Sequence, residues 1–340
     1  MALLEVRDLH VEFDTPDGVV HAVRGLSFDV ERGSTLAVVG ESGSGKSVAT
    51  QTITGLTRGA RVTGSAVFDG TELLGASEET LRAVRGARIG MIFQDPLSSL
   101  HPYYTVGWQV AEMIRAHDRT VTRAMARERA AELLSLVGIP RARRRVDDYP
   151  HQFSGGMRQR VMIAMAVALD PDLLIADEPT TALDVTVQAQ VLEVMQQLQD
   201  RFGTAIVLIT HDLGVVAEMA DEVVVMYAGR AMEVAPRREL FYHPHHPYSE
   251  GLLRSLPSRG EPGSRLVPVP GAPPSLLDPP QGCPFRPRCP HAFADCHDQP
   301  PLRPVGGSPD HLSACWLPPS RGTTTGEVPA PAARELQEAP

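Results

Sequence analysis

One stretch of the sequence decides the fold: Gly40-Glu41-Ser42-Gly43-Ser44-Gly45-Lys46-Ser47. It follows the apolar run Thr35-Leu36-Ala37-Val38-Val39, which predicts a strand, and it precedes residues that favour a helix. This spacing is typical of a phosphate-binding loop, because glycines let backbone N–H groups face an anion at the positive end of a helix. The Lys46 ammonium is placed to bind β- and γ-phosphate oxygens, and the Ser47 hydroxyl to ligate Mg²⁺. The sequence therefore predicts a site for a nucleoside triphosphate.

Length and composition are those of a globular protein. The chain has 340 residues, of which 42% are hydrophobic and 21% charged, and this length suggests about two domains of roughly 150 residues each. The net charge of -9 at pH 7 argues against binding of nucleic acid through bulk electrostatics. The N-terminal residues lack a signal-peptide pattern, and no apolar run approaches the roughly 18 residues that span a bilayer. We therefore expect a cytosolic chain that reaches a membrane only through other proteins.

Two adjacent carboxylates end a short apolar run. Leu173 to Ala176 predicts a buried parallel strand, and Asp177 and Glu178 follow it directly. Ligands of α/β sheets bind at the carboxyl ends of the strands. We therefore expect Asp177 to hold Mg²⁺, directly or through water, and Glu178 to polarise a water that attacks the γ-phosphate. The alternative, an acidic N-cap for the next helix, explains only one of the two carboxylates.

Further candidates for the nucleotide site lie elsewhere in the chain. His211 follows another predicted strand, and we interpret it as a γ-phosphate contact rather than a structural histidine. Phe13 lies in the first predicted strand, where its ring either stacks on the base or belongs to the core. Ser154, Gly155 and Gly156 open an apolar helix, and the free N–H groups at such a helix start suit an anion.

Together these motifs resemble the nucleotide-binding subunit of an ATP-binding cassette (ABC) transporter. The match runs from about Leu3 to Val234 and contains, in order, the phosphate loop, a glutamine loop at Gln94, the signature that begins at Ser154, the acidic strand end, Asp184 and the switch histidine. The signature reads Phe-Ser-Gly-Gly-Met here, whereas its commonest form is Leu-Ser-Gly-Gly-Gln. The serine and the glycines that face phosphate are kept.

The resemblance implies an α/β fold: a P-loop NTPase parallel-sheet core with an N-terminal antiparallel β region, an inserted helical subdomain and a C-terminal cysteine-containing extension. It also implies that two such domains close head to tail around two ATP molecules, so that Ser154 and Gly156 serve the partner's nucleotide. Catalytic roles are implied for Lys46, Gln94, Glu178 and His211, and Mg²⁺ contacts for Ser47, Gln94 and Asp177. The residues implied to bind ATP are Phe13, Gly40, Ser42, Gly43, Ser44, Gly45, Lys46, Ser47, Ser154, Gly155, Gly156 and Asp184.

The predicted domain boundaries follow the motifs and the composition. We expect an ABC ATPase domain at 1–235, with the helical subdomain at about 96–160, then an extension at 236–320 and a disordered tail at 321–340. The extension contains His246-Pro247-Tyr248 and Gly282-Cys283-Pro284-Phe285, and it is similar to that of ATPases from oligopeptide, dipeptide and nickel importers. We interpret His243 to Tyr248 as a turn before a helix rather than a metal-binding tract.

All four cysteines of the chain, Cys283, Cys289, Cys296 and Cys315, fall in this extension. In a cytosolic protein such clustering suggests a metal or redox site rather than structural disulfides. The spacing lacks paired C-x2-C knuckles, so by itself it does not choose between Zn²⁺, a 4Fe–4S cluster and free thiols. The resemblance to the importer subfamily implies the iron–sulfur cluster, with Zn²⁺ as the alternative.

The resemblance further implies an ATP-hydrolysing, energy-coupling subunit of an importer (a translocase). Its cargo would be di- or oligopeptides, with nickel or another small solute as the alternative. The implied partners are a second ABC ATPase subunit, expected to be a different chain, two transmembrane permease subunits and an external substrate-binding protein, and not nucleic acid. The implied location is the cytoplasmic face of the cell membrane. A soluble ABC ATPase that acts on nucleic acid is the competing hypothesis, but such proteins typically carry two cassettes or long coiled coils, and no heptad run is sustained here.

Overall fold

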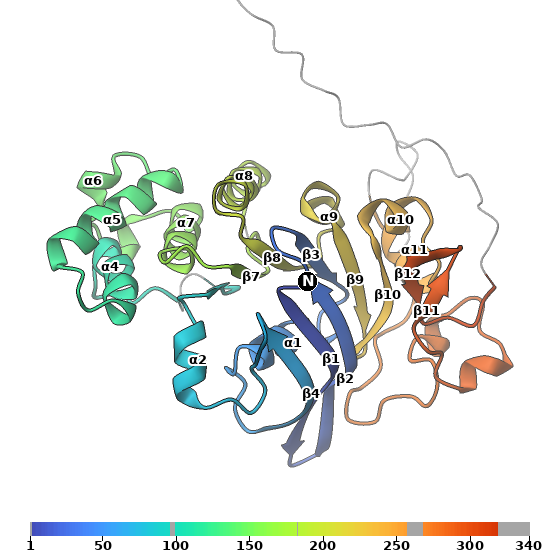
Figure 1. The fold of residues 1–340 in the computed structure, drawn as a ribbon. Helices are drawn as coiled ribbons and strands as arrows, with labels where there is room; N and C mark the ends of the chain where they lie inside the picture. Colours follow the sequence, from blue (N-terminus) through green and yellow to red (C-terminus); the bar gives the residue numbers. More distant parts are fainter. Residues whose placement is uncertain (1, 96–98, 182, 257–267, 319–340) are drawn as a thin grey trace, which may run out of the picture.

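The computed structural model of the chain describes residues 2–95, 99–181, 183–256 and 268–318. They form two β-sheets with helices around them, and a group of helices stands to one side (Figure 1). The predicted tail at 321–340 lies outside the described residues. Among the helices described, none combines the length and the hydropathy that a membrane crossing requires.

The N-terminal region is an antiparallel sheet with the strand order β2-β1-β4-β5. Strands β1 (Leu4–Thr15) and β2 (Gly18–Val30) form a hairpin, and β4 (Ala60–Phe68) pairs with the other edge of β1. The short β5 (Thr71–Glu72) ends the sheet. One face packs on a core that includes buried side chains of β1 and β2, since alternate residues of each strand point inward. The predicted antiparallel region is therefore confirmed.

The second sheet carries the predicted site residues. Its strand order is β11-β12-β10-β9-β3-β8-β7-β6, and the strands from β9 to β6 run parallel. Every residue of β3, β7 and β8 is buried, as their largely apolar sequences predict. Because β8 lies between β3 and β7, the residues that follow these three strands meet at one edge. The parallel strands are β3 (Thr35–Val39), β6 (Ile89–Ile92), β7 (Leu173–Asp177), β8 (Ala205–Thr210) and β9 (Glu222–Tyr227).

The helices divide between the sheets and a separate helical group. The group at the left of Figure 1 contains α4 (Val106–His117), α5 (Arg123–Leu136), α6 (Ala142–Arg145) and α7 (Gly155–Ala166), and its core continues into α8 (Val185–Phe202). It corresponds to the helical region expected at about 96–160, although α7 crosses that boundary and leads toward β7. Among the described residues, the other α-helices are α1 (Lys46–Ile53), α2 (Glu78–Val84), α9 (Leu213–Met219), α10 (Arg237–Tyr242) and α11 (Pro247–Arg254).

The C-terminal extension shares the second sheet, which the sequence analysis did not predict. Strand β12 (Ser308–Ser313) pairs antiparallel with β10 (Arg230–Pro236), and β11 (Arg303–Val305) pairs with β12. The extension also contains the short 3-10 turns η3 (Arg286–Arg288) and η4 (Ala294–His297). A third hydrophobic core joins side chains of β9 and α9 to Tyr248, Phe285 and two of the cysteines. The extension therefore packs against the cassette and is not connected to it by the chain alone.

A buried carboxylate fixes the extension to the sheet. Glu233 of β10 accepts hydrogen bonds from the backbone N–H groups of His245 and His246, at 2.7 and 3.0 Å. His311 of β12 places its Nε2 atom 2.7 Å from the same carboxylate. Burial alone would raise the pKa of Glu233, but these hydrogen bonds hold the pKa below its ordinary value. Glu233 therefore stays ionised inside the protein, because its hydrogen-bond partners stabilise the charged carboxylate.

Candidate functional site

The phosphate loop joins β3 to α1 in a conformation that needs glycine. Gly43 and Gly45 have φ angles of 79° and 97°, in the left-handed region that other residues rarely adopt. A Cβ atom at Gly45 would lie 2.3 Å from the carbonyl oxygen of Ala22, and one at Gly40 would lie 2.1 Å from that of Met226. The spacing of the glycines in the motif thus follows from backbone conformation and from close packing.

The ammonium group of Lys46 lies inside this loop. The residue is 6% exposed, and its Nζ atom donates hydrogen bonds to the carbonyl oxygens of Gly40 and Glu41, at 2.8 and 3.0 Å. Burial lowers the pKa of Lys46, while the nearby carboxylates of Glu178 and Asp177 act to raise it. A buried cation beside the N-terminus of α1 fits the triphosphate of ATP, which offers it anionic oxygens.

Ser47 and Asp177 meet at the base of the loop. The Ser47 hydroxyl donates a hydrogen bond of 2.8 Å to Asp177 Oδ1. Asp177 is 3% exposed, and this burial raises the pKa of its carboxyl, whereas the bond from Ser47 acts to lower it. Carboxylate and hydroxyl oxygens are ligands of Mg²⁺, and a divalent cation would stabilise the ionised form of a buried carboxyl. The two residues therefore lie together and fit Mg²⁺.

Glu178 is held by side chains from three places in the chain. Gln94 Nε2 and Thr181 Oγ1 each donate a hydrogen bond of 2.9 Å to its Oε2 atom, and His211 Nδ1 lies 3.4 Å from Oε1. The backbone of Glu178 has a φ of 49°, a strained conformation that is concentrated at functional sites. The predicted residues Gln94, Glu178 and His211 are thus brought together. Thr181 was missed, and its hydroxyl three residues after Glu178 was the signal for it.

Two of the other predicted residues, Ser154 and Asp184, make their side-chain hydrogen bonds locally. Ser154 caps α7 by accepting a hydrogen bond of 3.4 Å from the Met157 N–H group, and Ser154 and Gly155 are exposed. Asp184 caps α8 and accepts a hydrogen bond of 2.9 Å from Val187. Phe13 of β1 is half-buried against the core of the antiparallel sheet. Their roles toward a nucleotide stay predictions.

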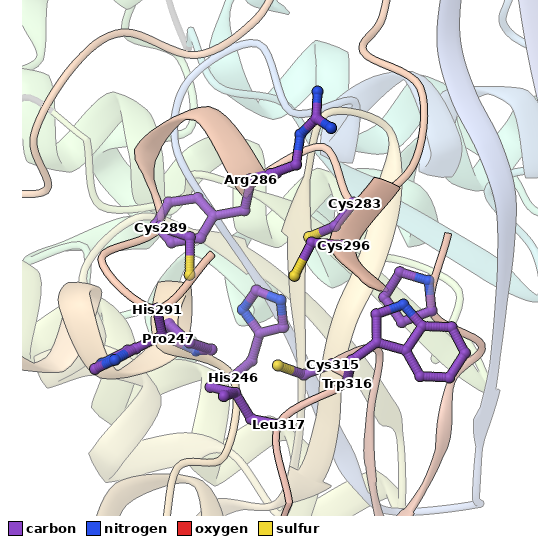
Figure 2. Close-up of a pocket in the computed structure, with 12 residues that line it drawn as sticks. His246, Pro247, Cys283, Arg286, Cys289, His291, Cys296, Cys315, Trp316 and Leu317 are labelled. Carbon is purple, nitrogen blue, oxygen red and sulfur yellow. The ribbon is translucent and has the colours of Figure 1, made fainter. Parts of the chain in front are cut away.

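The four cysteines line one small cavity in the extension. Cys283, Cys289, Cys296 and Cys315 are free thiols whose sulfur atoms point into this cavity (Figure 2). Within the described ranges, no three His, Cys, Asp or Glu side chains are placed close enough to hold one metal ion. Burial raises the pKa of Cys283 to about 11, and it also raises the pKa values of Cys289 and Cys315. The structure therefore gathers the four residues in one place.

His246 brings an unsatisfied polar atom into the same cavity. Its buried ring lies among the cysteine sulfur atoms in Figure 2. Its Nδ1 atom accepts a hydrogen bond of 3.0 Å from the Tyr248 N–H group, so the ring proton is on Nε2. That Nε2 atom has no hydrogen-bond partner among the residues the structure describes. A buried donor without an acceptor costs about 1–3 kcal/mol, so the cavity fits a group that accepts a hydrogen bond. His246 is also the N-cap of α11, which confirms the predicted turn before a helix.

Comparison with known proteins places these features in one family. The family model described as "ABC transporter" matches residues 23–181, and the one described as "Oligopeptide/dipeptide transporter, C-terminal region" matches residues 232–296. The oligopeptide transport ATP-binding protein OppD of Salmonella typhimurium is 53% identical over 318 residues, which are 93% of this chain and 94% of that protein. This chain belongs to the ABC transporter family. The resemblance inferred from its motifs is confirmed.

Other members of the family give the same result for sequence and fold. The dipeptide transport ATP-binding protein DppD of Bacillus subtilis is 50% identical over 322 residues, which are 94% of this chain and 96% of the relative. A dimeric structure of the ATP-binding cassette MJ0796, bound to ADP and Pi, is 25% identical with a TM-score of 0.63. It covers 69% of this chain and 99% of MJ0796. The predicted cassette fold is therefore confirmed, and the extension adds to it.

Proposed function

We propose that this chain is the ATP-hydrolysing subunit of an importer for oligopeptides or dipeptides. The observation that carries the proposal is the cluster at the sheet edge, in which Ser47 contacts Asp177 while Gln94 and His211 hold Glu178. Relatives named as oligopeptide and dipeptide transport ATP-binding proteins, about half identical over nearly the whole chain, support the cargo class. The match of the C-terminal region to that transporter class supports it as well.

The proposed mechanism assigns each residue a step in phosphoryl transfer. Lys46 and the N–H groups of the loop bind the β- and γ-phosphates, and Ser47 and Asp177 hold Mg²⁺. Bound Mg²⁺ supplies positive charge that stabilises the transition state. Glu178 polarises the attacking water, and Gln94 and His211 orient its carboxylate. Gln94 is also a proposed contact of Mg²⁺, and His211 senses the γ-phosphate. Catalysis of this kind depends on positioning and charge more than on covalent chemistry.

We also propose that the chain works in a pair and at a membrane. The signature residues Ser154 and Gly155 are exposed at the start of α7, so they are free to face a partner's nucleotide. Gly156 lies in the first turn of the same helix and faces that nucleotide as well. The proposed second ATPase is a different chain, and Asp184 and Phe13 complete each nucleotide site.

Two permease subunits dock on the Gln94 loop and the helical group, which holds the chain at the cytoplasmic face of the membrane. An external binding protein delivers the cargo. The functional units are the cassette at 1–235 and the extension at 236–320.

Uptake assays test the proposed cargo. In cells that lack this chain, uptake of a labelled tripeptide is expected to be lost, to return with the wild-type chain and to stay absent with Glu178→Gln, because transport needs hydrolysis. Uptake of labelled Ni²⁺ is measured in the same cells as the control and is expected to be unchanged. Nickel uptake that depends on the chain, with peptide uptake unaffected, would assign the alternative cargo instead.

We further propose that the cysteine cavity holds a 4Fe–4S cluster. Four thiolates are a ligand set for this cluster and for Zn²⁺. The sulfur atoms of the four cysteines point into one shared cavity, so the ligand set is gathered in one place. The donor at His246 Nε2 suits the anionic sulfides of a cluster.

Metal analysis of protein purified without oxygen tests this cofactor. We expect about four irons and about four sulfides per chain, and absorbance from cysteinyl-iron charge transfer. Cys289→Ser is expected to lose most of the iron, since it removes one ligand. Cys289 is the half-buried member of the set, so this variant disturbs the core least. Stoichiometric zinc without iron in the wild-type chain would contradict the cluster and assign Zn²⁺.

A further inference from the structure

Two residues of the extension bind one residue of the phosphate loop. The Arg288 guanidinium donates hydrogen bonds of 2.6 and 2.9 Å to the two carboxylate oxygens of Glu41. The Tyr248 hydroxyl accepts a hydrogen bond of 2.9 Å from the Glu41 backbone N–H group. Glu41 is the second residue of the loop, directly after Gly40. The extension thus holds both the side chain and the backbone of one loop residue.

The pair joins a buried guanidinium to a partly exposed carboxylate and has a fixed geometry. The Arg288 side chain is 4% exposed. Its other donors reach the carbonyl oxygens of Pro270 and Val269, at 2.7 and 3.2 Å, and the Tyr227 hydroxyl at 3.1 Å. Hydrogen bonding to Glu41 raises the pKa of Arg288, so the guanidinium stays charged. A two-pronged pair of this kind holds its partner in one orientation, because both oxygens are engaged.

Both connections begin at the lining of the cysteine cavity. Arg288 ends the 3-10 turn η3 and directly precedes Cys289, which lines the cavity. The Tyr248 N–H group donates to His246, whose ring enters the cavity (Figure 2). The rings of Tyr227, Tyr248 and Phe285 pack on one another with centroids 4.7 to 5.4 Å apart. A change in the shape of the cavity therefore has a short, well-packed route to Glu41.

Within the phosphate loop, Glu41 contacts Lys46, the residue proposed to bind the phosphates of the nucleotide. The carbonyl oxygen of Glu41 accepts one of the hydrogen bonds of Lys46, so a displaced Glu41 changes the site that orients this ammonium. The hydrogen bonds that Arg288 and Tyr248 make to the phosphate loop go to Glu41, so we assign both as positioning residues.

We infer that Glu41 couples the cysteine cavity to the phosphate loop, so that the chain binds Mg-ATP tightly only while the segment from Cys283 to Cys289 keeps the conformation seen here. By linkage, bound Mg-ATP stabilises the occupied cavity by the same factor. The contacts of Glu41 do not depend on the proposed cluster. The inference rests on that cluster only as the group that keeps the cavity in its present shape.

Nucleotide affinity of variants tests the contact itself. We measure the Kd of a fluorescent ATP analogue with Mg²⁺ on the purified full chain. Arg288→Gln and Glu41→Gln are each expected to weaken binding about tenfold, and the double variant no further, because they break the same pair. Tyr248→Phe removes only the hydroxyl and is expected to weaken binding in the same direction. Arg254→Gln, at an exposed position of α11, is the matched control and is expected to leave the Kd unchanged.

The pattern of these values decides the outcome. An unchanged Kd in both Arg288→Gln and Tyr248→Phe would overturn the inference. If the effects of Arg288→Gln and Glu41→Gln on the Kd add in the double variant, the pair between Arg288 and Glu41 is overturned as the route of the coupling. Thermal unfolding of each variant shows that it is folded. In steady-state assays of the assembled complex we expect KM to rise more than kcat falls, which a general loss of stability would not produce.

Removal of the cofactor tests the cavity end separately. Treatment with ferricyanide and EDTA is expected to weaken Mg-ATP binding about tenfold in the wild-type chain and to have little further effect in Arg288→Gln. If iron is bound and its removal leaves the Kd of the wild-type chain unchanged, the coupling is overturned and the cofactor assignment is kept. A chain purified with no metal would instead overturn the cofactor, and the variant cycle above would still decide the coupling.

Discussion

Glu178→Gln is expected to bind Mg-ATP with a Kd within about twofold of the wild-type value and to hydrolyse it at least about 100-fold more slowly. The variant keeps the shape of the side chain, and its amide oxygen still accepts the hydrogen bonds that Gln94 and Thr181 donate. The carboxylate that we propose to polarise the attacking water is gone. Phosphate release by the assembled complex measures the rate, and titration of the isolated chain measures the Kd.

A second readout follows from the proposed pairing. When hydrolysis is blocked and binding is intact, closed dimers are expected to accumulate in Mg-ATP, which light scattering coupled to size-exclusion chromatography detects. Lys46→Met is the control, because it removes the buried ammonium and is expected to lose nucleotide binding and closure together. Hydrolysis by Glu178→Gln at the wild-type rate would remove Glu178 from the catalytic role and leave the binding roles of Lys46 and Ser47 intact.

The sequence was enough to predict the cluster at the sheet edge. Asp177 and His211 each follow an apolar run, and parallel strands bring their carboxyl ends to the same edge. Ser47 and Asp177, which are 130 positions apart, consequently share a hydrogen bond. Ser154, Gly155 and Gly156 were expected to open a helix, and α7 begins at Gly155 because the N-cap at Ser154 outweighs the poor helix propensity of glycine.

The contacts of the extension could not be predicted in the same way. Arg288 and Glu41 are 247 positions apart, and neither hydrophobic periodicity nor a motif relates them. Strands β11 and β12 lie in a segment rich in proline and glycine, where an edge strand leaves only a weak pattern. The cysteine spacing did not select a metal. The shared cavity and the unsatisfied His246 depend on tertiary packing, which only the structure supplies.

Gly155→Asp is expected to fold as the wild-type chain does, to bind Mg-ATP with an unchanged Kd and to lower ATP hydrolysis by the assembled complex at least about 100-fold. A Cβ atom at Gly155 would meet nothing within 4 Å, so the side chain has room in the isolated chain. An acidic residue in the first turn of α7 also suits the helix dipole, so stability is expected to be kept. Its carboxylate would repel a phosphate that approaches this helix start from a partner.

Gly155→Ala separates charge from size in this experiment. It occupies the same open space without a charge and is expected to keep activity within about tenfold of the wild-type rate. Gly156 does not serve this purpose, since a Cβ atom there would lie 2.3 Å from Val187 Cγ1 and disturb the contact between α7 and α8. If Gly155→Asp weakens nucleotide binding by the isolated chain, the signature serves its own nucleotide. If it leaves hydrolysis intact in the complex, the signature does not face a nucleotide at all. An unchanged Kd together with lost hydrolysis is the combination that only a site completed by a partner produces.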